Sequence, residues 1–339
     1  MARRHAEEDE VISAVSAALG GLDRVLLAVS GGLDSMVLLH ASSSLPKSGR
    51  PRLRVANFDH RTGDAARRAT LRVGRAARSA GLDFVTAAAN TRQSTEHEWR
   101  KERWRFLRSA ATAFKAPVAT AHTLDDQVET VFIRALRDSG PRGLAGLYAE
   151  SEILHPFLGL TRSTLARYAD THGISYIDDP SNLSRTHLRN RVRHDLLPAI
   201  ARVRPTFAAE LLDVARGAAG WRVAIDQIAE GVRVVHQDDG SLRIARSDLA
   251  GYSADSLRVL WPAIAARAGV IMDRRGTQRL AQFTIDGATG GAIQLSGGVE
   301  VRMYRGYMLI RKWDWRRVEE IRSTRAAQRG ASSFSIRHA

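Results

Sequence analysis

The amino-acid sequence predicts an α/β protein in which a doubly wound parallel sheet is followed by a smaller α+β domain. In the first two-thirds of the chain, short apolar runs alternate with helical patterns, as in parallel sheets whose strands are joined by helices. After about residue 206 the pattern changes to a long Ala-rich helix and later to short alternating runs separated by Gly-containing turns. The length of 339 residues is typical of two domains.

Four short apolar runs are expected to form the parallel sheet, at 24–29, 53–58, 84–88 and 118–121. Helices are expected near 34–44, 64–80, 97–115 and 124–137. Another is expected at 161–172, because Thr161 suits an N-cap and Gly173 a C-terminal stop. A last helix of this region is expected from Thr186 to Leu197, ending before Pro198.

The rest of the chain is expected to form a separate small domain. It comprises a long helix at 206–236, a strand at 242–245, helices near 254–268 and 276–285, and an antiparallel meander at 292–310 with turns at Gly297–Gly298 and Arg305–Gly306. We therefore assign residues 1–205 to the sheet domain and residues 206–315 to a helical linker and small domain. The Arg- and Ser-rich residues 316–339 are expected to be a disordered basic tail.

The composition narrows the range of functions. The chain has no cysteine, which excludes disulfides, thiolate metal sites, iron–sulfur clusters held by this chain and a persulfide carried on its own sulfur. The net charge of +15 favours a polyanionic partner, although the preference for Arg over Lys also fits codon bias in a GC-rich genome. No apolar run approaches the roughly 18 residues of a membrane span, and no secretory signal is recognisable. We expect a soluble cytoplasmic protein that does not bind membranes.

A phosphate-binding loop is predicted directly after the first strand, where Ser30-Gly31-Gly32-Leu33-Asp34-Ser35 leads into an apolar helix. Glycines let a backbone approach an anion closely, and the N-terminus of a helix supplies N–H donors and a positive dipole end. An acid in such a loop indicates a Mg²⁺ bridge or a positioning role. The alternative is an ordinary helix cap after a glycine turn. The loop has no Lys, so it is not of the Walker type.

A second group of polar residues follows the fourth strand. His122 falls at the carboxyl edge of the predicted sheet, where doubly wound folds bind ligands. Asp126 and Glu129 are three residues apart and share a helix face, so they can hold an ammonium ion or a metal. Arg134 and Arg137 follow on the same helix, and a guanidinium there could stabilise a departing pyrophosphate. The alternatives are a helix start with acids in its first turn and a solvated basic face.

The six-residue loop resembles the pyrophosphate loop of the PP-loop ATPases, whose fold is the adenine nucleotide alpha hydrolase-like one. Other stretches resemble the tRNA(Ile)-lysidine synthetase family: 122–130, 137–146, 156–162, Asp179-Pro180-Ser181-Asn182 and 189–198. The resemblance covers residues 22–200 strongly and 240–312 weakly, and the length is similar to a short form of the family with one C-terminal domain. Two places depart from the family pattern: the loop 57–63 is shorter and altered, and Asp138 stands where Gly is common.

The resemblance implies a ligase that forms a carbon–nitrogen bond. ATP would adenylate the C2 oxygen of the wobble cytidine in an isoleucine tRNA with a CAU anticodon, and free lysine would then displace AMP. It implies ATP contacts at Ser30, Gly31, Gly32, Leu33, Asp34, Ser35 and Asn57. Catalytic roles would fall to Asp34, Arg103, His122, Asp126 and Arg137, Mg²⁺ binding to Asp34 and Asp126, and lysine binding to Asp126 and Glu129.

The tRNA is expected to contact Arg189, Asn190 and Arg193, together with the small C-terminal domain. Arg189 and Arg193 lie four residues apart and share a helix face, which the turn at 179–182 would direct toward the tRNA, whereas Arg191 points elsewhere. A solvated basic helix is the alternative. A homodimer is left open, because no residue pattern decides the oligomeric state.

Three other functions compete with this one. A PP-loop thiolase is disfavoured because such enzymes commonly use cysteines, and this chain has none. An amide-forming synthetase that uses ammonia would leave the stretch from Asp179 to Arg193 unexplained. A non-catalytic protein that binds ATP or RNA would release no pyrophosphate in response to lysine and tRNA.

Overall fold

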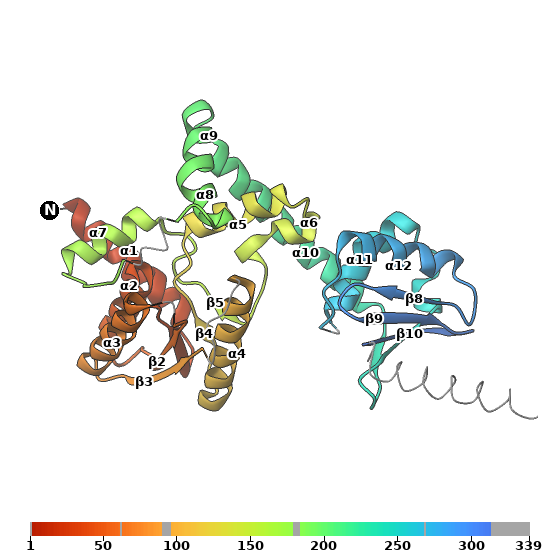
Figure 1. Ribbon diagram of the computed structural model, residues 1–339, viewed down its shortest axis with the longest axis horizontal. Helices are drawn as coiled ribbons and strands as arrows, with labels where there is room; N and C mark the ends of the chain where they lie inside the picture. Colours follow the sequence, from red (N-terminus) through yellow and green to blue (C-terminus); the bar gives the residue numbers. More distant parts are fainter. Residues whose placement is uncertain (1, 62, 90–95, 179–183, 268, 313–339) are drawn as a thin grey trace, which may run out of the picture. The chain divides into compact units, whose positions relative to one another are not determined.

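The computed structural model describes residues 2–61, 63–89, 96–178, 184–267 and 269–312 (Figure 1). Contacts divide the chain into two compact units, Met1–Ala219 and Gly220–Ala339. The boundary between the units falls within helix α10 (Phe207–Glu230), whereas the sequence placed it before this helix, between residues 205 and 206. The predicted tail, 316–339, lies outside the described residues.

The first unit contains a five-stranded parallel sheet in the order β3-β2-β1-β4-β5. The four predicted strands are confirmed as β1 (Arg24–Ala28), β2 (Arg52–Asp59), β3 (Asp83–Ala88) and β4 (Val118–Ala119). The fifth, β5 (Ile153–Leu154), was not predicted. The strand order reverses between β1 and β4, and ligands bind at the carboxyl side of such a reversal in doubly wound sheets.

Helices cover both faces of this sheet, as predicted. Val25 and Leu27 of β1 pack in one core with α1 (Ala2–Leu19), α2 (Leu33–Ser44), α3 (Asp64–Ser79) and α7 (Arg162–Thr171). Leu26 packs on the opposite face with Leu107 and Phe114 of α4 (Glu96–Phe114). The alternation along β1 therefore buries both faces, which is why all its residues after Arg24 are apolar.

Helix α5 (Leu124–Leu136) follows β4 at the carboxyl edge, and the short α6 (Pro141–Leu144) comes after it. Between them Asp138 has φ +52°, a left-handed conformation in which Asp is one of the better substitutes for Gly. This geometry accounts for the unusual Asp at the end of α5. The predicted helix at 161–172 is confirmed: Thr161 caps α7 by accepting from the Thr164 N–H, and Gly173 has φ +60°.

Two predicted helix ends were wrong. The helix expected to end before Pro198 continues as α8 (Leu188–Arg191), a π-helical turn over Val192–Leu196, and α9 (Leu197–Val203). Pro198 lies in the first turn of α9, next to the π turn, where its missing N–H costs little. The helix expected over 206–236 ends at Glu230, and Val234–His236 instead forms strand β6.

The second unit holds an antiparallel sheet in the order β6-β7-β10-β9-β8. The predicted strand and meander are confirmed as β7 (Leu242–Ala245), β8 (Ala292–Leu295), β9 (Val299–Met303) and β10 (Tyr307–Lys312). The two predicted helices are α11 (Ala254–Ala266) and α12 (Arg274–Asp286). Trp261 is fully buried in the core between them and the sheet, and its indole N–H donates to Thr284 Oγ1 at 2.9 Å. None of the helices in the described ranges has the length and apolar character needed to cross a membrane.

Candidate functional site

The loop between β1 and α2 is organised around the buried hydroxyl of Ser35. Ser35 Oγ accepts hydrogen bonds from the backbone N–H groups of Ser30 and Gly31, both at 3.1 Å, and donates to the Gly32 carbonyl at 2.9 Å. Gly32, the N-cap of α2, supplies no side-chain cap. The first-turn N–H groups of α2 are therefore left for an anion, because no preceding carbonyl of the helix can accept from them.

The two glycines of the loop have different structural roles. Gly31 has φ +98°, and a Cβ built there would lie 2.8 Å from Ala69 Cβ on α3. The fold itself therefore requires glycine at this position. Gly32 has φ −78° and ψ 167°, which any residue can adopt, and a Cβ there would meet only Ser30 Oγ at 3.8 Å. The space beside Gly32 is open to a ligand that approaches the backbone.

Asn57 supports this loop from β2. Its side chain is 2% exposed, its amide nitrogen donates to the Val29 carbonyl at 2.8 Å, and its amide oxygen accepts from Thr70 Oγ1 at 2.8 Å. These bonds tie the residue before the loop to β2 and α3. The structure thus gives Asn57 a supporting role, and its direct contact with ATP stays a prediction.

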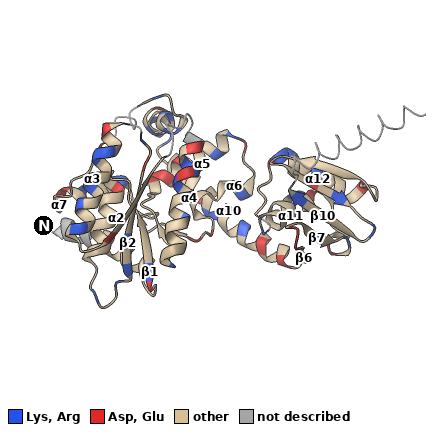
Figure 2. Cartoon of the chain, turned by 60° about the horizontal axis from the view of Figure 1, so that its bottom comes forward, with Lys and Arg blue, Asp and Glu red and all other residues tan. Residues whose placement is uncertain are grey.

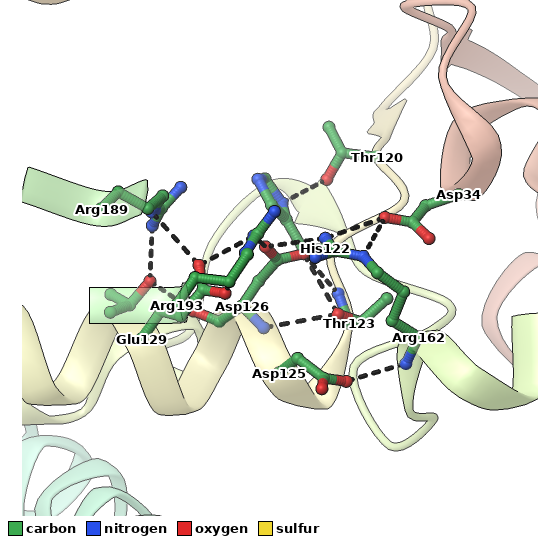
Figure 3. A network of polar contacts seen from close by, with 11 residues as sticks. Asp34, Thr120, His122, Thr123, Asp125, Asp126, Glu129, Arg162, Arg189 and Arg193 are labelled. Atoms are coloured by element: carbon green, nitrogen blue, oxygen red, sulfur yellow. Dashed lines mark hydrogen bonds and ion pairs between the residues drawn. The ribbon is translucent and has the colours of Figure 1, made fainter. Parts of the chain in front are cut away.

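Asp34 points from the first turn of α2 toward Arg162, the first residue of α7 (Figure 3). Asp34 Oδ2 accepts from Arg162 Nε at 3.1 Å and pairs with its terminal nitrogen at 3.0 Å. Asp34 Oδ1 is buried and has no hydrogen-bond partner among the described residues. Burial raises the pKa of Asp34, and the neighbouring Arg162 opposes this only in part. A buried, unpartnered carboxylate oxygen is what a Mg²⁺ ligand requires, so this residue fits the ion.

Asp126 takes part in the capping box at the start of α5 and also contacts two arginines. Its Oδ2 accepts from the Thr123 N–H at 3.0 Å, while the Asp126 N–H donates to Thr123 Oγ1, which completes a capping box. Its Oδ1 lies 3.0 Å from Arg193 and 3.5 Å from Arg162. Burial raises the pKa of Asp126, but the Thr123 hydrogen bond and the nearby arginines outweigh it, so the pKa is lowered overall. The sequence offered a helix start and a charged site as alternatives, and Asp126 takes part in both.

Glu129 is almost completely buried, with a side chain 3% exposed, and it is held by two arginines. Arg193 donates from Nε to Glu129 Oε1 and from its terminal nitrogen to Oε2 at 2.9 Å, a two-pronged pair. Arg189 lies 3.6 Å from Glu129 Oε2 and donates to Thr130 Oγ1 at 2.9 Å. Arg189 and Arg193 do share a face, as predicted, but that face meets these acids; Arg191 is exposed.

His122 and His155 share one hydroxyl at the same edge of the sheet. Thr120 Oγ1 lies 2.9 Å from His122 Nδ1 and 2.8 Å from His155 Nδ1. Desolvation lowers the pKa of His122 to about 4 and lowers the pKa of His155 as well. The charges of Arg103 and Arg189 also act to lower the pKa of His122. Both imidazoles are therefore neutral at pH 7, and a neutral imidazole can accept a proton or a hydrogen bond.

The structure brings several of the predicted site residues into one cluster and leaves others aside. Asp34, Asp126, Glu129, Arg189 and Arg193 are linked by ion pairs, in part through Arg162, and the charge of Asp126 acts on the pKa of His122. Asn190 donates to the Ser184 carbonyl at 2.8 Å. Arg137 is exposed at the far end of α5, and among the described residues no hydrogen bond or ion pair joins it to the cluster. The turn at 179–182 lies outside the described residues.

Arg162, Thr120 and His155 were not predicted as site residues. Arg162 was noticed only as part of a resembling stretch, and its contact with Asp34 joins residues 128 positions apart. No local spacing could indicate that contact. Arg134, weighed as a candidate for pyrophosphate, donates to the Gly143 carbonyl and so tethers the loop after α5. Within the described ranges, no three His, Asp or Glu side chains gather as a closed metal site would require.

The fold and the sequence match known proteins. A family model described as a PP-loop domain matches residues 7–200. Among solved structures, U34-tRNA thiolase NcsA from Methanococcus maripaludis superposes with a TM-score of 0.51 at 15% identity, over 63% of this chain and 78% of that one. At this identity the likeness shows the fold alone, and it confirms the predicted fold class.

Curated relatives carry the name tRNA(Ile)-lysidine synthase. The protein of Alkalilimnicola ehrlichii is 35% identical over 56% of this chain and 45% of its own length. That of Geobacter sulfurreducens is 34% identical over 61% of this chain and 46% of its own length. The chain thus spans about half the length of these relatives. That of Petrotoga mobilis is 29% identical over 66% of this chain and 74% of its own length.

These matches confirm the resemblance that the sequence motifs indicated. The matched region contains the Ser30–Ser35 loop and the whole cluster around Asp126. The chain belongs to the PP-loop domain family.

Proposed function

We propose that the chain ligates free lysine to C2 of the wobble cytidine in an isoleucine tRNA with a CAU anticodon, at the expense of ATP. The C2 oxygen attacks the α-phosphate of ATP and pyrophosphate leaves. The amine of lysine then attacks C2, and AMP leaves with that oxygen. The names of the curated relatives support this reaction. Such a protein would work in the cytoplasm, where its tRNA substrate is found.

One observation of the structure carries the proposal: three carboxylates and three guanidinium groups share a single cluster beside an uncapped helix N-terminus. The acids are Asp34, Asp126 and Glu129, and the bases are Arg162, Arg189 and Arg193. A site for a triphosphate and a cationic amino acid needs both signs of charge within one small space. Without ligands these groups neutralise one another, because unpaired charges are expensive to bury.

Ligands would exchange partners within this cluster. Phosphates of ATP would bind the first turn of α2 and draw arginines toward them, since guanidinium groups pair well with phosphate. Asp126 and Glu129 would then be free to bind the ammonium groups of lysine. Asp34 Oδ1 would hold Mg²⁺, which would neutralise charge on the phosphates. In the absence of ligands, Arg189 and Arg193 therefore pair with the carboxylates that would bind the ammonium groups of lysine.

The neutral His122 would serve the second step. Its pKa, lowered by burial to about 4, leaves an imidazole that accepts a hydrogen bond from the attacking amine at pH 7. Arg103, whose charge acts to lower the pKa of His122, would stabilise negative charge on a departing phosphate. We keep Arg137 as a catalytic candidate only for a bound state in which the end of α5 contacts the substrate.

The second unit would bind the tRNA. Arg243 stacks its guanidinium 4.1 Å from the centre of the Tyr307 ring, and Tyr307 stacks on Tyr304 at 4.6 Å. Arginine and tyrosine together on a sheet offer both phosphate and base contacts. Asn190 remains a proposed tRNA contact on α8. A homodimer stays a prediction that a measurement of mass in solution would test.

The proposal is tested by separating the two steps. Pyrophosphate release should require ATP, Mg²⁺ and the tRNA, whereas AMP release should also require lysine. The amine-binding role of Glu129 predicts that Glu129→Gln raises the Michaelis constant for lysine far more than that for ATP. A protein that binds ATP and tRNA but never releases pyrophosphate would be a binding protein, and the proposal would be wrong.

A further inference from the structure

Helix α3 presents an exposed face that is rich in arginine, on which Asp64 and Leu71 are also exposed. Arg67, Arg68, Arg75 and Arg78 are exposed, and Asp64 is the only acid of the helix. The opposite face, with Val73, Gly74 and Ala77, is buried against the sheet. Figure 2 shows basic segments along α3. The helix is therefore strongly amphipathic, and its polar side is predominantly basic.

These four arginines have no carboxylate partner among the described residues, whereas several other arginines on the surface do. Arg54 pairs with Asp83 at 3.2 Å, and Arg204 pairs with Glu210 at 2.9 Å. Like charges one turn apart on a helix destabilise it by a few tenths of a kcal/mol per pair, roughly. Arg67 and Arg68 also lie near the N-terminus of α3, where the helix dipole disfavours cations. Within the free protein, the helix dipole thus favours only Arg78, in the last turn of α3, whereas Arg67, Arg68 and Arg75 gain nothing from their charges.

The basic face begins beside the phosphate loop. Ala69 of α3 packs against Gly31, and Thr70 donates to Asn57 at 2.8 Å. Arg67 and Arg68 are adjacent in sequence to these contacts, and the face extends away from them through Arg75 to Arg78. At about 1.5 Å per residue, the arginines cover roughly 16 Å along the helix axis. A polyanion whose reacting nucleotide lies at the cluster can continue along this face.

We propose that the exposed face of α3, defined by Arg67, Arg68, Arg75 and Arg78, binds the phosphate backbone of the RNA substrate next to the nucleotide that reacts. The inference rests on the proposed function and adds the surface that holds the substrate. Its chemistry is that of a backbone contact: arginines attract successive phosphates without reading bases. It therefore contributes affinity and salt dependence more than sequence preference.

The test compares two triple variants with equal loss of charge. The first is Arg67→Gln, Arg68→Gln and Arg75→Gln on α3. The control is Arg105→Gln and Arg108→Gln on α4 with Arg202→Gln on α9, all exposed. Gln keeps helix propensity close to that of Arg, so both proteins should fold, which a melting curve checks. Binding of an isoleucine tRNA transcript is measured at several salt concentrations.

The α3 variant should bind the transcript at least about tenfold more weakly, and its salt slope should fall by two to three, about one for each phosphate that an arginine no longer neutralises. Its ATP affinity without tRNA should match the parent. The control should keep both the affinity and the slope. Equal losses in the two variants would mean that only net charge matters and would overturn the proposal, as would an unchanged α3 variant. Loss of binding to anionic lipid vesicles alone, with tRNA binding kept, would assign the face to a membrane instead.

Failure of this inference is distinguishable from failure of the proposed function. If the parent forms lysidine and the α3 variant binds the transcript like the parent, the α3 surface is wrong and the reaction stands. If the parent forms no lysidine but the α3 variant loses affinity for the transcript, the surface stands and the reaction is wrong.

Discussion

The two glycines of the phosphate loop allow its structural and ligand-binding roles to be separated by two single substitutions. Gly31→Ala forces a side chain into φ +98° and brings its Cβ to 2.8 Å from Ala69 Cβ. Backbone strain of about 1–3 kcal/mol and overpacking of about 1–3 kcal/mol add to a loss of about 2–6 kcal/mol in the free energy of unfolding. Gly32→Ala meets an allowed backbone conformation and open space, so its stability should change by less than about 1 kcal/mol.

For nucleotide binding, Gly32→Ala is expected to have the larger effect of the two substitutions. If phosphates approach the backbone at Gly32, the added methyl group occupies their place, and the affinity for ATP should fall at least about tenfold, or about 1.4 kcal/mol. Denaturant unfolding gives the stabilities, and titration calorimetry with Mg²⁺ and ATP gives the affinities. A Gly32→Ala protein with the parent's ATP affinity would refute the assignment of this loop as the phosphate site. A Gly31→Ala protein as stable as the parent would refute its geometry.

Three further predictions concern the charged cluster. Because burial raises the pKa of Asp34, its ionised form destabilises the folded protein as the pH rises through the folded pKa. Asp34→Asn should therefore not lower the melting temperature, although it should abolish turnover. Retained turnover would contradict the proposed role of Asp34 in binding Mg²⁺. Arg193→Met leaves Glu129 and Asp126 without their shared partner and should destabilise the protein by about 3 kcal/mol in denaturant unfolding. Arg191→Met, at an exposed position two residues earlier, should cost less than about 0.5 kcal/mol. Equal effects of the two substitutions would show that the cluster does not stabilise the fold. Because the pKa of His122 is lowered to about 4 in the folded protein, the unfolded chain binds this proton first as the pH falls. The free energy of unfolding should therefore decrease between about pH 6.5 and 4, by at most about 3 kcal/mol. His122→Asn should flatten that part of the curve of stability against pH, and an unchanged curve would disprove the burial argument.

The sequence was sufficient to predict the elements that repeat regularly. The strand Arg24–Ala28 is apolar at every position that the sheet buries on its two faces, and the meander after Ala292 is marked by its glycine turns. The loop Ser30–Ser35 was predictable because its residues are contiguous. Local patterns also indicated the shared face of Arg189 and Arg193, since four residues make about one helical turn.

The sequence could not indicate what these faces touch. Arg193 was assigned to the tRNA from its motif, yet without ligands its guanidinium pairs with Glu129 and Asp126, more than sixty residues earlier in the chain. Such ion pairs depend on how α5, α7 and α8 come together, and tertiary packing of that kind leaves no periodic trace. The helix that continues past Pro198 illustrates a second limit, because a π turn absorbs the irregularity that proline usually imposes.

The mass of the product nucleoside decides whether this cluster joins lysine to a cytidine of tRNA. The protein is incubated with ATP, Mg²⁺, isotopically labelled lysine and an isoleucine tRNA transcript with a CAU anticodon. The tRNA is then digested to nucleosides, which are analysed by mass spectrometry. The proposed reaction gives one new nucleoside, a cytidine heavier by lysine less one water and carrying the label, and none when ATP is omitted or Asp34 is replaced by Asn. Cytidine that stays unmodified when all substrates are present, or a product that gains mass without the lysine label, would contradict the proposed reaction.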